Sequence, residues 1–230
     1  NNETGIIQPI KEIGEVLLDH QTYFHTDAVQ AYGLLPIDVN ELHVDLLSVS
    51  SHKINGPKGL GFLYTQQDVP LQTLQFGGEQ ERKRRAGTEN IAGIAGFAKA
   101  IELIQANRET NIEQYQSFRR LFLDTLKEKN ISFKVNGSES EKVPNIINVS
   151  FPNMNVETLL TNFDLSGVAA SSGSACTAGS VEPSHVLTAM YEADHPCTTN
   201  SIRFSFGLAN NKANVKEAAE RVATIIQRLS

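Results

Sequence analysis

Lys53 is the first residue whose type and position suggest chemistry. It follows a histidine in the stretch SSHKINGPKG (50–59), and the apolar run VDLLSV (44–49) before it predicts a buried strand. Taken alone, Lys53 is most simply a charge placed where a strand reaches water. A lysine amine held beside buried strands loses solvation, however, and becomes a usable nucleophile and base of the kind that forms Schiff bases. Ser50, His52 and the turn at Gly56 offer hydroxyl, imidazole and N–H donors for an anion such as phosphate.

Asp27 ends a second stretch of interest, FHTDAVQ (24–30). A carboxylate at the end of a strand usually caps it or begins a turn. The alternative is a ligand role, because a pyridoxal phosphate site needs a carboxylate against the pyridinium nitrogen to keep the ring an electron sink. Gln30, three residues later, could donate to the phenolate oxygen of that ring. Open α/β sheets bind ligands at their strand ends, so Asp27 and Lys53 can converge on one ligand.

The chain has two cysteines, Cys176 and Cys197. Their number favours thiols over a disulfide, and neither has a second ligand at metal-binding spacing, so no metal site is predicted. Cys176 lies in SSGSACTAGS (171–180), a stretch too rich in Gly and Ser to pack as core. It predicts a mobile loop with an exposed thiol, whose thiolate form is strongly nucleophilic. A small buried hydrophobic residue is the other interpretation of a cysteine, and it fits Cys197 better.

Two further residues suit anionic groups. Arg203 lies in the middle of the strand-like SIRFSF (201–206), where it is either an ion-paired or snorkelling side chain or a fork for a substrate carboxylate. Thr88, in RRAGTEN (84–90), is expected to cap a helix. The N-terminus of that helix, with the basic run before it, would also favour a phosphate.

The elements that must position these residues alternate between strand and helix, which favours an α/β class. In the first half we expect a helix at 9–20, strands at 22–27, 44–50 and 60–65, and a helix from 88 to 107. One face of that last helix should carry Ile91, Ile94, Ala98, Ile101 and Ile104. The polar stretch NRETNIE (107–113) marks a domain boundary. Beyond it we expect helices near 112–129, 155–163 and 212–229, and strands near 131–135, 145–151 and 201–207.

The bulk composition excludes some classes of protein. The 230 residues suffice for one large or two modest domains, and 40% of them are hydrophobic. The net charge of −6 gives no electrostatic footprint for nucleic acid. The sequence lacks an apolar run of about eighteen residues, so we expect no membrane span, and its N-terminus does not resemble a signal peptide.

Taken together and in order, several motifs resemble the cysteine desulfurases of the NifS/IscS type, which are class V aminotransferases. The motifs are NNETGIIQP, HTDAVQAYGLLPIDV, DLLSVSSHKINGPKGLGFLY, FGGEQERKRRAGTENIAGIAG, SSGSACTAGSVEPSHVL and SIRFSFG. The resemblance covers essentially the whole chain. It implies the pyridoxal-phosphate-dependent transferase fold type I. Residues 1–108 would be the second half of the large mixed-sheet cofactor domain. Residues 109–230 would be the small α/β domain, with a mobile catalytic cysteine loop at about 170–182.

The resemblance also assigns cofactor-binding residues. Lys53 matches the lysine that binds pyridoxal 5'-phosphate covalently, and Asp27 matches the carboxylate on the pyridinium nitrogen. Gln30 and Asn2 match residues near the phenolic oxygen, whereas Ser50 and His52 match ligands of the phosphate. Thr88 matches a threonine that reaches the phosphate of the other subunit's cofactor, which implies a homodimer. Family members are longer, so a further N-terminal part, with a phosphate loop and a histidine stacked on the ring, is expected before Asn2.

The implied reaction removes sulfur from L-cysteine. Arg203, with Asn2, would bind the substrate carboxylate, and Cys176 would take the sulfur as a persulfide while L-alanine leaves. The persulfide would pass to an acceptor protein in the cytoplasm, either an iron–sulfur scaffold or a tRNA-thiolation enzyme. Two alternatives remain open. One is another fold type I enzyme, an aminotransferase or a selenocysteine lyase, and the other is a truncated, non-catalytic docking module for a sulfur acceptor.

Overall fold

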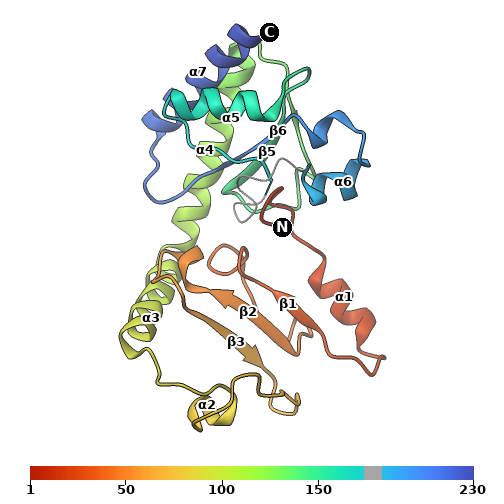
Figure 1. The fold of residues 1–230 in the computed structure, drawn as a ribbon, viewed down its shortest axis with the longest axis vertical. Helices are drawn as coiled ribbons and strands as arrows, with labels where there is room; N and C mark the ends of the chain where they lie inside the picture. Colours follow the sequence, from red (N-terminus) through yellow and green to blue (C-terminus); the bar gives the residue numbers. More distant parts are fainter. Residues whose placement is uncertain (174–182) are drawn as a thin grey trace. The chain divides into compact units, whose positions relative to one another are not determined.

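The computed structural model describes residues 1–173 and 183–230, and these form two compact units (Figure 1). The first unit is Pro9–Arg108, and the second combines Asn1–Gln8 with Glu109–Ser230. The first eight residues therefore group with the second unit, although the sequence analysis assigns them to the first domain. Backbone hydrogen bonds explain the difference, because Val143 N donates to Gly5 O at 2.8 Å and Ile7 N donates to Glu141 O at 2.9 Å.

The first unit is built on a three-stranded sheet in the order β1-β2-β3 (Figure 1). Strand β1 (His25–Asp27) runs parallel to β2 (Leu46–Ser50), and β3 (Gly61–Thr65) runs antiparallel to β2. The helices of this unit are α1 (Ile10–Leu17), the 3-10 helix η1 (Ser51–Ile54), the short α2 (Gln80–Lys83) and α3 (Ile91–Ala106). The strand expected at 22–27 is shorter in the structure, and α2 was not expected.

Helix α3 contributes to the core of the first unit through a face that shares only Ile101 and Ile104 with the face that the sequence predicts. Its buried residues are Gly93, Phe97, Ala100 and Ile104, and the last three form a core cluster with Leu47 and Val49 of β2. Ile91 and Ile94 are 69% and 44% exposed. Nearly every position of this helix is apolar or small, so the hydrophobic pattern does not single out one face. The aromatic ring of Phe97 selects the face, because it stacks on Phe62 of β3 with the ring centroids 5.8 Å apart.

The second unit is built on an antiparallel sheet in the order β4-β5-β6. Its strands are β4 (Lys134–Val135), β5 (Ile146–Ser150) and β6 (Ser201–Ser205). Its helices are α4 (Arg108–Glu128), α5 (Val156–Leu165), α6 (His185–Tyr191), the 3-10 helix η3 (Pro196–Thr198) and α7 (Lys212–Leu229). The sequence predicts all of these except α6 and η3, within a few residues at each end.

Aromatic rings from α4, α5 and β6 fill the core of the second unit. Phe122 of α4 is 2% exposed, and its ring centroid lies 4.6 Å from that of Phe204. Phe163 of α5 also packs on Phe204, with the centroids 6.0 Å apart. In the described parts of the chain, no helix is both long and apolar enough to cross a membrane.

Candidate functional site

The topology of the first unit brings four predicted site residues to one edge of its sheet. Because β1 and β2 are parallel, their carboxyl ends lie at the same edge, with Asp27 ending β1 and Ser50 ending β2. The register places Asp27 beside Ser48, two residues before Ser50. His52 and Lys53 follow directly in η1. A carboxylate, a hydroxyl, an imidazole and an amine are thus grouped at the strand ends, where open α/β sheets bind ligands.

A tight turn holds Lys53 at this edge. Ser51 N donates to Leu60 O at 3.0 Å, and Gly56 N donates to Ser51 O at 3.0 Å, so both ends of η1 are fixed. Asn55 has a left-handed backbone with φ of 64°. A Cβ on Gly56 would collide with the Ser51 hydroxyl, so only glycine fits there. The Ser51 side chain is fully buried, and its hydroxyl has no hydrogen-bond partner in the described parts of the chain.

Lys53 itself is exposed in the structure, as is His52. Of the two interpretations of Lys53 from the sequence, this exposure agrees with a charge placed where a strand reaches water. Within η1 the buried residues are Ser51 and Ile54, whereas His52 and Lys53 between them face outward. Ser50 and Gln30 are half-buried.

Asp27 has a structural role as well as a candidate chemical one. Its Oδ1 accepts a hydrogen bond from Val29 N at 2.8 Å, which begins the turn that contains Gln30. Tyr32 N closes that turn by donating to Ala28 O at 2.8 Å. The carboxylate is exposed, and its Oδ2 makes no hydrogen bond to any described residue. Both interpretations of Asp27 from the sequence are therefore compatible with its geometry.

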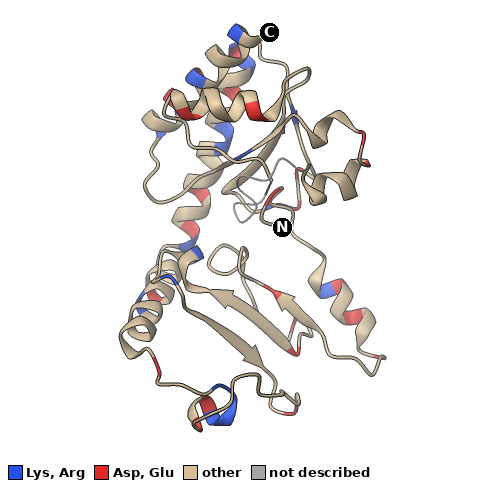
Figure 2. Cartoon of the chain, in the orientation of Figure 1, with Lys and Arg blue, Asp and Glu red and all other residues tan. Residues whose placement is uncertain are grey.

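Thr88 does not cap the helix that follows it. Helix α3 begins at Ile91, and the Asn90 side chain caps it by accepting from Gly93 N at 3.0 Å. The asparagine lies two residues closer to the helix and accepts the bond that was expected for the threonine. Thr88 is exposed and lies three residues before α3. The basic run that precedes it is exposed too, and Figure 2 shows the Lys and Arg that gather at α2.

In the second unit, the structure brings Arg203 and Asn2 together although 201 positions separate them. Arg203 Nη1 donates to the carbonyl oxygen of Asn2 at 2.9 Å. Arg203 is half-buried on β6, opposite Asn148 of β5, and its backbone N–H donates to Ser171 O at 2.7 Å. The guanidinium predicted to bind a substrate carboxylate and the asparagine predicted to assist it are therefore neighbours.

Only one of the two cysteines can be placed. Cys176 lies outside the described residues. Cys197 is a free cysteine, 4% exposed, and its Sγ is a weak donor to Ser150 Oγ at 3.5 Å. This environment agrees with the buried hydrophobic role that the sequence favours for Cys197.

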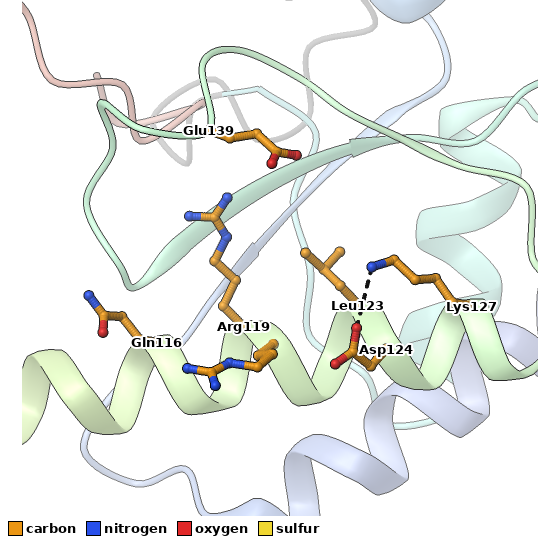
Figure 3. Close-up of a pocket in the computed structure, with 7 residues that line it drawn as sticks. Gln116, Arg119, Leu123, Asp124, Lys127 and Glu139 are labelled. Carbon is orange, nitrogen blue, oxygen red and sulfur yellow. Dashed lines mark hydrogen bonds and ion pairs between the residues drawn. The ribbon is translucent and has the colours of Figure 1, made fainter.

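A separate charged cluster on the second unit has no counterpart in the sequence analysis. Figure 3 shows Arg119 reaching from α4 toward Glu139 across a pocket, with Lys127 paired to Asp124 at 3.3 Å on the same helix. Nearby Lys142 is 8% exposed, and its Nζ has no hydrogen-bond partner among the described residues. Burial and the Arg119 guanidinium lower the pKa of Lys142 to about 8, while Glu139 opposes the shift. The spacing of these residues in the sequence does not predict the cluster, because only the tertiary fold brings α4 close to Glu139 and Lys142.

Lys142→Met is expected to raise the free energy of unfolding at pH 7 by about 1–3 kcal/mol. At pH 7 the lysine is charged in both states, and the folded state bears the cost of burying that charge. Between the folded pKa of about 8 and the ordinary value of 10.5, the folded state binds fewer protons than the unfolded state. In that pH window the free energy of unfolding of the wild type therefore rises with pH. The stability advantage of Lys142→Met over the wild type becomes smaller as a result.

Urea denaturation of both proteins at pH 7 and pH 10 measures this difference, with the exposed Lys216→Met as the control. A stability difference that stays constant with pH contradicts the prediction.

The fold and the site define a mixed α/β protein whose parallel strand ends gather a lysine, a carboxylate, a hydroxyl and an imidazole. The chain belongs to the aminotransferase class-V family, whose sequence pattern matches residues 1–217. This family uses pyridoxal phosphate. Family membership confirms what the motifs of the sequence indicate.

Similarity to individual proteins is more specific than the family match. IscS 1 of Bacillus subtilis (strain 168), a putative cysteine desulfurase, is 59% identical over 230 residues, which are 100% of this chain and 61% of the relative. The cysteine desulfurase IscS of Methanosarcina thermophila is 46% identical over 229 residues, 100% of this chain and 56% of the relative. The structure of a NifS-like protein from Rickettsia africae ESF-5 matches with a TM-score of 0.88 at 30% identity, covering 99% of this chain and 60% of that chain. The expected fold is thereby confirmed over part of the length of these proteins. The chain spans 56% to 61% of these curated relatives.

Proposed function

We propose that this chain carries the catalytic lysine and the sulfur-accepting cysteine of a pyridoxal-phosphate-dependent cysteine desulfurase. The main support is the convergence of Asp27, Ser50, His52 and Lys53 at one sheet edge. The similarity to cysteine desulfurases over the whole chain supports the choice of reaction.

The residues at this edge fit the cofactor on the chemistry of their donor set. Lys53 presents a primary amine, the group that condenses with the cofactor's aldehyde, at an accessible position. Asp27 presents a carboxylate oxygen, Oδ2, that accepts no hydrogen bond from a described residue, and such an oxygen suits a pyridinium nitrogen. Ser50 and His52 supply a hydroxyl and an imidazole for the phosphate, next to the buried Ser51 hydroxyl that lacks a partner among the described residues. Gln30 and Asn2 would contact the phenolic oxygen, and Thr88 would reach the phosphate of a partner subunit's cofactor in a homodimer.

When bound, pyridoxal phosphate supplies an electron sink that stabilises negative charge at the substrate Cα. Asp27 keeps that sink effective by holding a proton on the pyridinium nitrogen. Lys53 anchors the cofactor and then moves the proton at the substrate Cα. Arg203 binds the carboxylate of L-cysteine through its guanidinium fork and so orients the substrate.

Cys176 performs the sulfur transfer. Its thiolate forms a bond to the substrate sulfur as the bond between that sulfur and Cβ breaks. The carbon keeps the electron pair, is protonated and leaves as L-alanine, so Cys176 is left as a persulfide. The persulfide would pass to an acceptor protein in the cytoplasm, either an iron–sulfur scaffold or a tRNA-thiolation enzyme.

Incubation of the intact protein with L-cysteine tests this function. We expect equal amounts of L-alanine and transferred sulfur, and peptide mass spectrometry should find one added sulfur atom on the peptide with Cys176 and none on that with Cys197. A protein that binds the cofactor but transfers an amino group instead would be an aminotransferase. A protein that stays colourless with added cofactor would be a docking module, and either result would contradict the proposal.

A further inference from the structure

Glu3 is a buried carboxylate that the proposed reaction does not use. Its side chain is 1% exposed. Charged carboxylates are rarely buried unless hydrogen bonds compensate the lost solvation. Glu3 Oε2 accepts a hydrogen bond from the hydroxyl of Ser184, which lies 181 positions away. Ser184 Oγ in turn accepts from Leu187 N at 3.2 Å and caps α6.

The carboxylate also borders a second segment. A Cβ placed on Gly173 would lie 3.6 Å from Glu3 Oε2 and 3.8 Å from Oε1, so a side chain at this position would meet the carboxylate. Two residues earlier, Ser171 exchanges backbone hydrogen bonds with Arg203, at 2.7 Å and 3.2 Å. Glu3 is therefore hydrogen-bonded to Ser184 on one side of Cys176 and lies near Gly173 on the other.

The backbone around Glu3 is joined to the candidate substrate site. The carbonyl oxygen of Glu3 accepts from Asn148 Nδ2 at 3.2 Å, and Asn148 is the cross-strand neighbour of Arg203. The carbonyl oxygen of Asn2 accepts from Arg203 Nη1 at 2.9 Å. One short stretch, Asn2–Glu3, thus contacts the guanidinium, the strand beside it and the residues that border Cys176.

We propose that Glu3 is a positioning residue. It fixes the position of Asn2 and Arg203 relative to Gly173 and Ser184, the described residues on either side of Cys176. The inference rests on the proposed function, because it assigns Glu3 to the geometry of sulfur transfer. Packing alone does not explain a carboxylate here, since an apolar side chain would fill the space without a buried charge. A fixed acceptor for the Ser184 hydroxyl does explain it.

Hydrogen exchange in the intact protein tests the positioning directly. In Glu3→Ala, the amides of Ser171 and Leu187 should exchange about tenfold faster than in the wild type. Glu3→Gln keeps an oxygen that accepts from Ser184 and should restore most of the protection. Ser184→Ala should free the Leu187 amide in the same way. Thr125→Val, which removes a buried hydroxyl bonded to Leu121 O within α4, is the control for general destabilisation.

Kinetics provide the second readout. Glu3→Ala should raise the KM for L-cysteine and slow persulfide formation at Cys176 by about tenfold each, with the cofactor still attached to Lys53. Wild-type exchange at Ser171 and Leu187 in Glu3→Ala would overturn the inference. The proposed function fails separately if L-cysteine leaves no sulfur on Cys176, and the exchange result would stand in that case.

Discussion

Replacing Lys53 with alanine is expected to lower the rate of sulfur release from L-cysteine by roughly 10³- to 10⁴-fold. The reason is the position of the amine, which lies one short turn beyond the end of β2 at the edge that also carries Asp27. Without it the chain loses both the covalent anchor of the cofactor and the base that moves the substrate proton. The characteristic absorbance of the lysine-bound cofactor should disappear in the same variant.

Two controls separate chemistry from charge. Lys53→Arg keeps a cation at the position, but its guanidinium stays protonated and cannot act as the nucleophile, so this variant should fail equally. Lys99→Ala removes an exposed lysine that pairs with Glu102 on α3, and turnover should stay within about twofold of wild type. Rapid turnover in Lys53→Arg would show that the position needs only a positive charge, and the assignment of Lys53 would be wrong.

The sequence contains enough information to place the main elements of this site. The run VDLLSV predicts the buried strand, and Leu47 and Val49 are indeed 2% and 3% exposed. Local patterns leave the burial of Lys53 open between two interpretations, because the turn that exposes it is held by a hydrogen bond between Ser51 N and Leu60 O. The capping of α3 by Asn90, in place of the predicted Thr88, has a similar cause. Several residues near the start of α3 are capable caps, and only the folded backbone selects one.

Residues that act through tertiary contacts were missed altogether. Glu3 and Lys142 look like ordinary surface charges in the sequence, yet they are 1% and 8% exposed. The groups that act on them lie far away in the chain, as with the Ser184 hydroxyl bonded to Glu3, or on another element, as with the Arg119 guanidinium that lowers the pKa of Lys142. Periodicity reports only neighbours within a few residues, so it cannot reveal such burial. The motif NNETG is the one signal that draws attention to Glu3, and it does so through Asn2.

Cys176→Ser is expected to abolish sulfur transfer while leaving the absorbance of the bound cofactor unchanged. Serine keeps the size of the side chain, but its hydroxyl is not ionised near neutral pH and cannot take over the sulfur. Residual sulfide formation should be lower than wild type by at least about 10³-fold. The measurement is sulfide and L-alanine release from L-cysteine, with the cofactor spectrum recorded on the same samples.

Cys197→Ser is the matched control for that variant. Cys197 is buried, and among the described residues its Sγ donates only to the Ser150 hydroxyl, so serine can preserve the contact and turnover should stay within about twofold. The pair of variants decides between the rival enzymes of this fold. An aminotransferase has no use for a thiol at position 176, so full turnover in Cys176→Ser would remove the desulfurase assignment, whereas loss in Cys176→Ser alone identifies the sulfur-accepting residue.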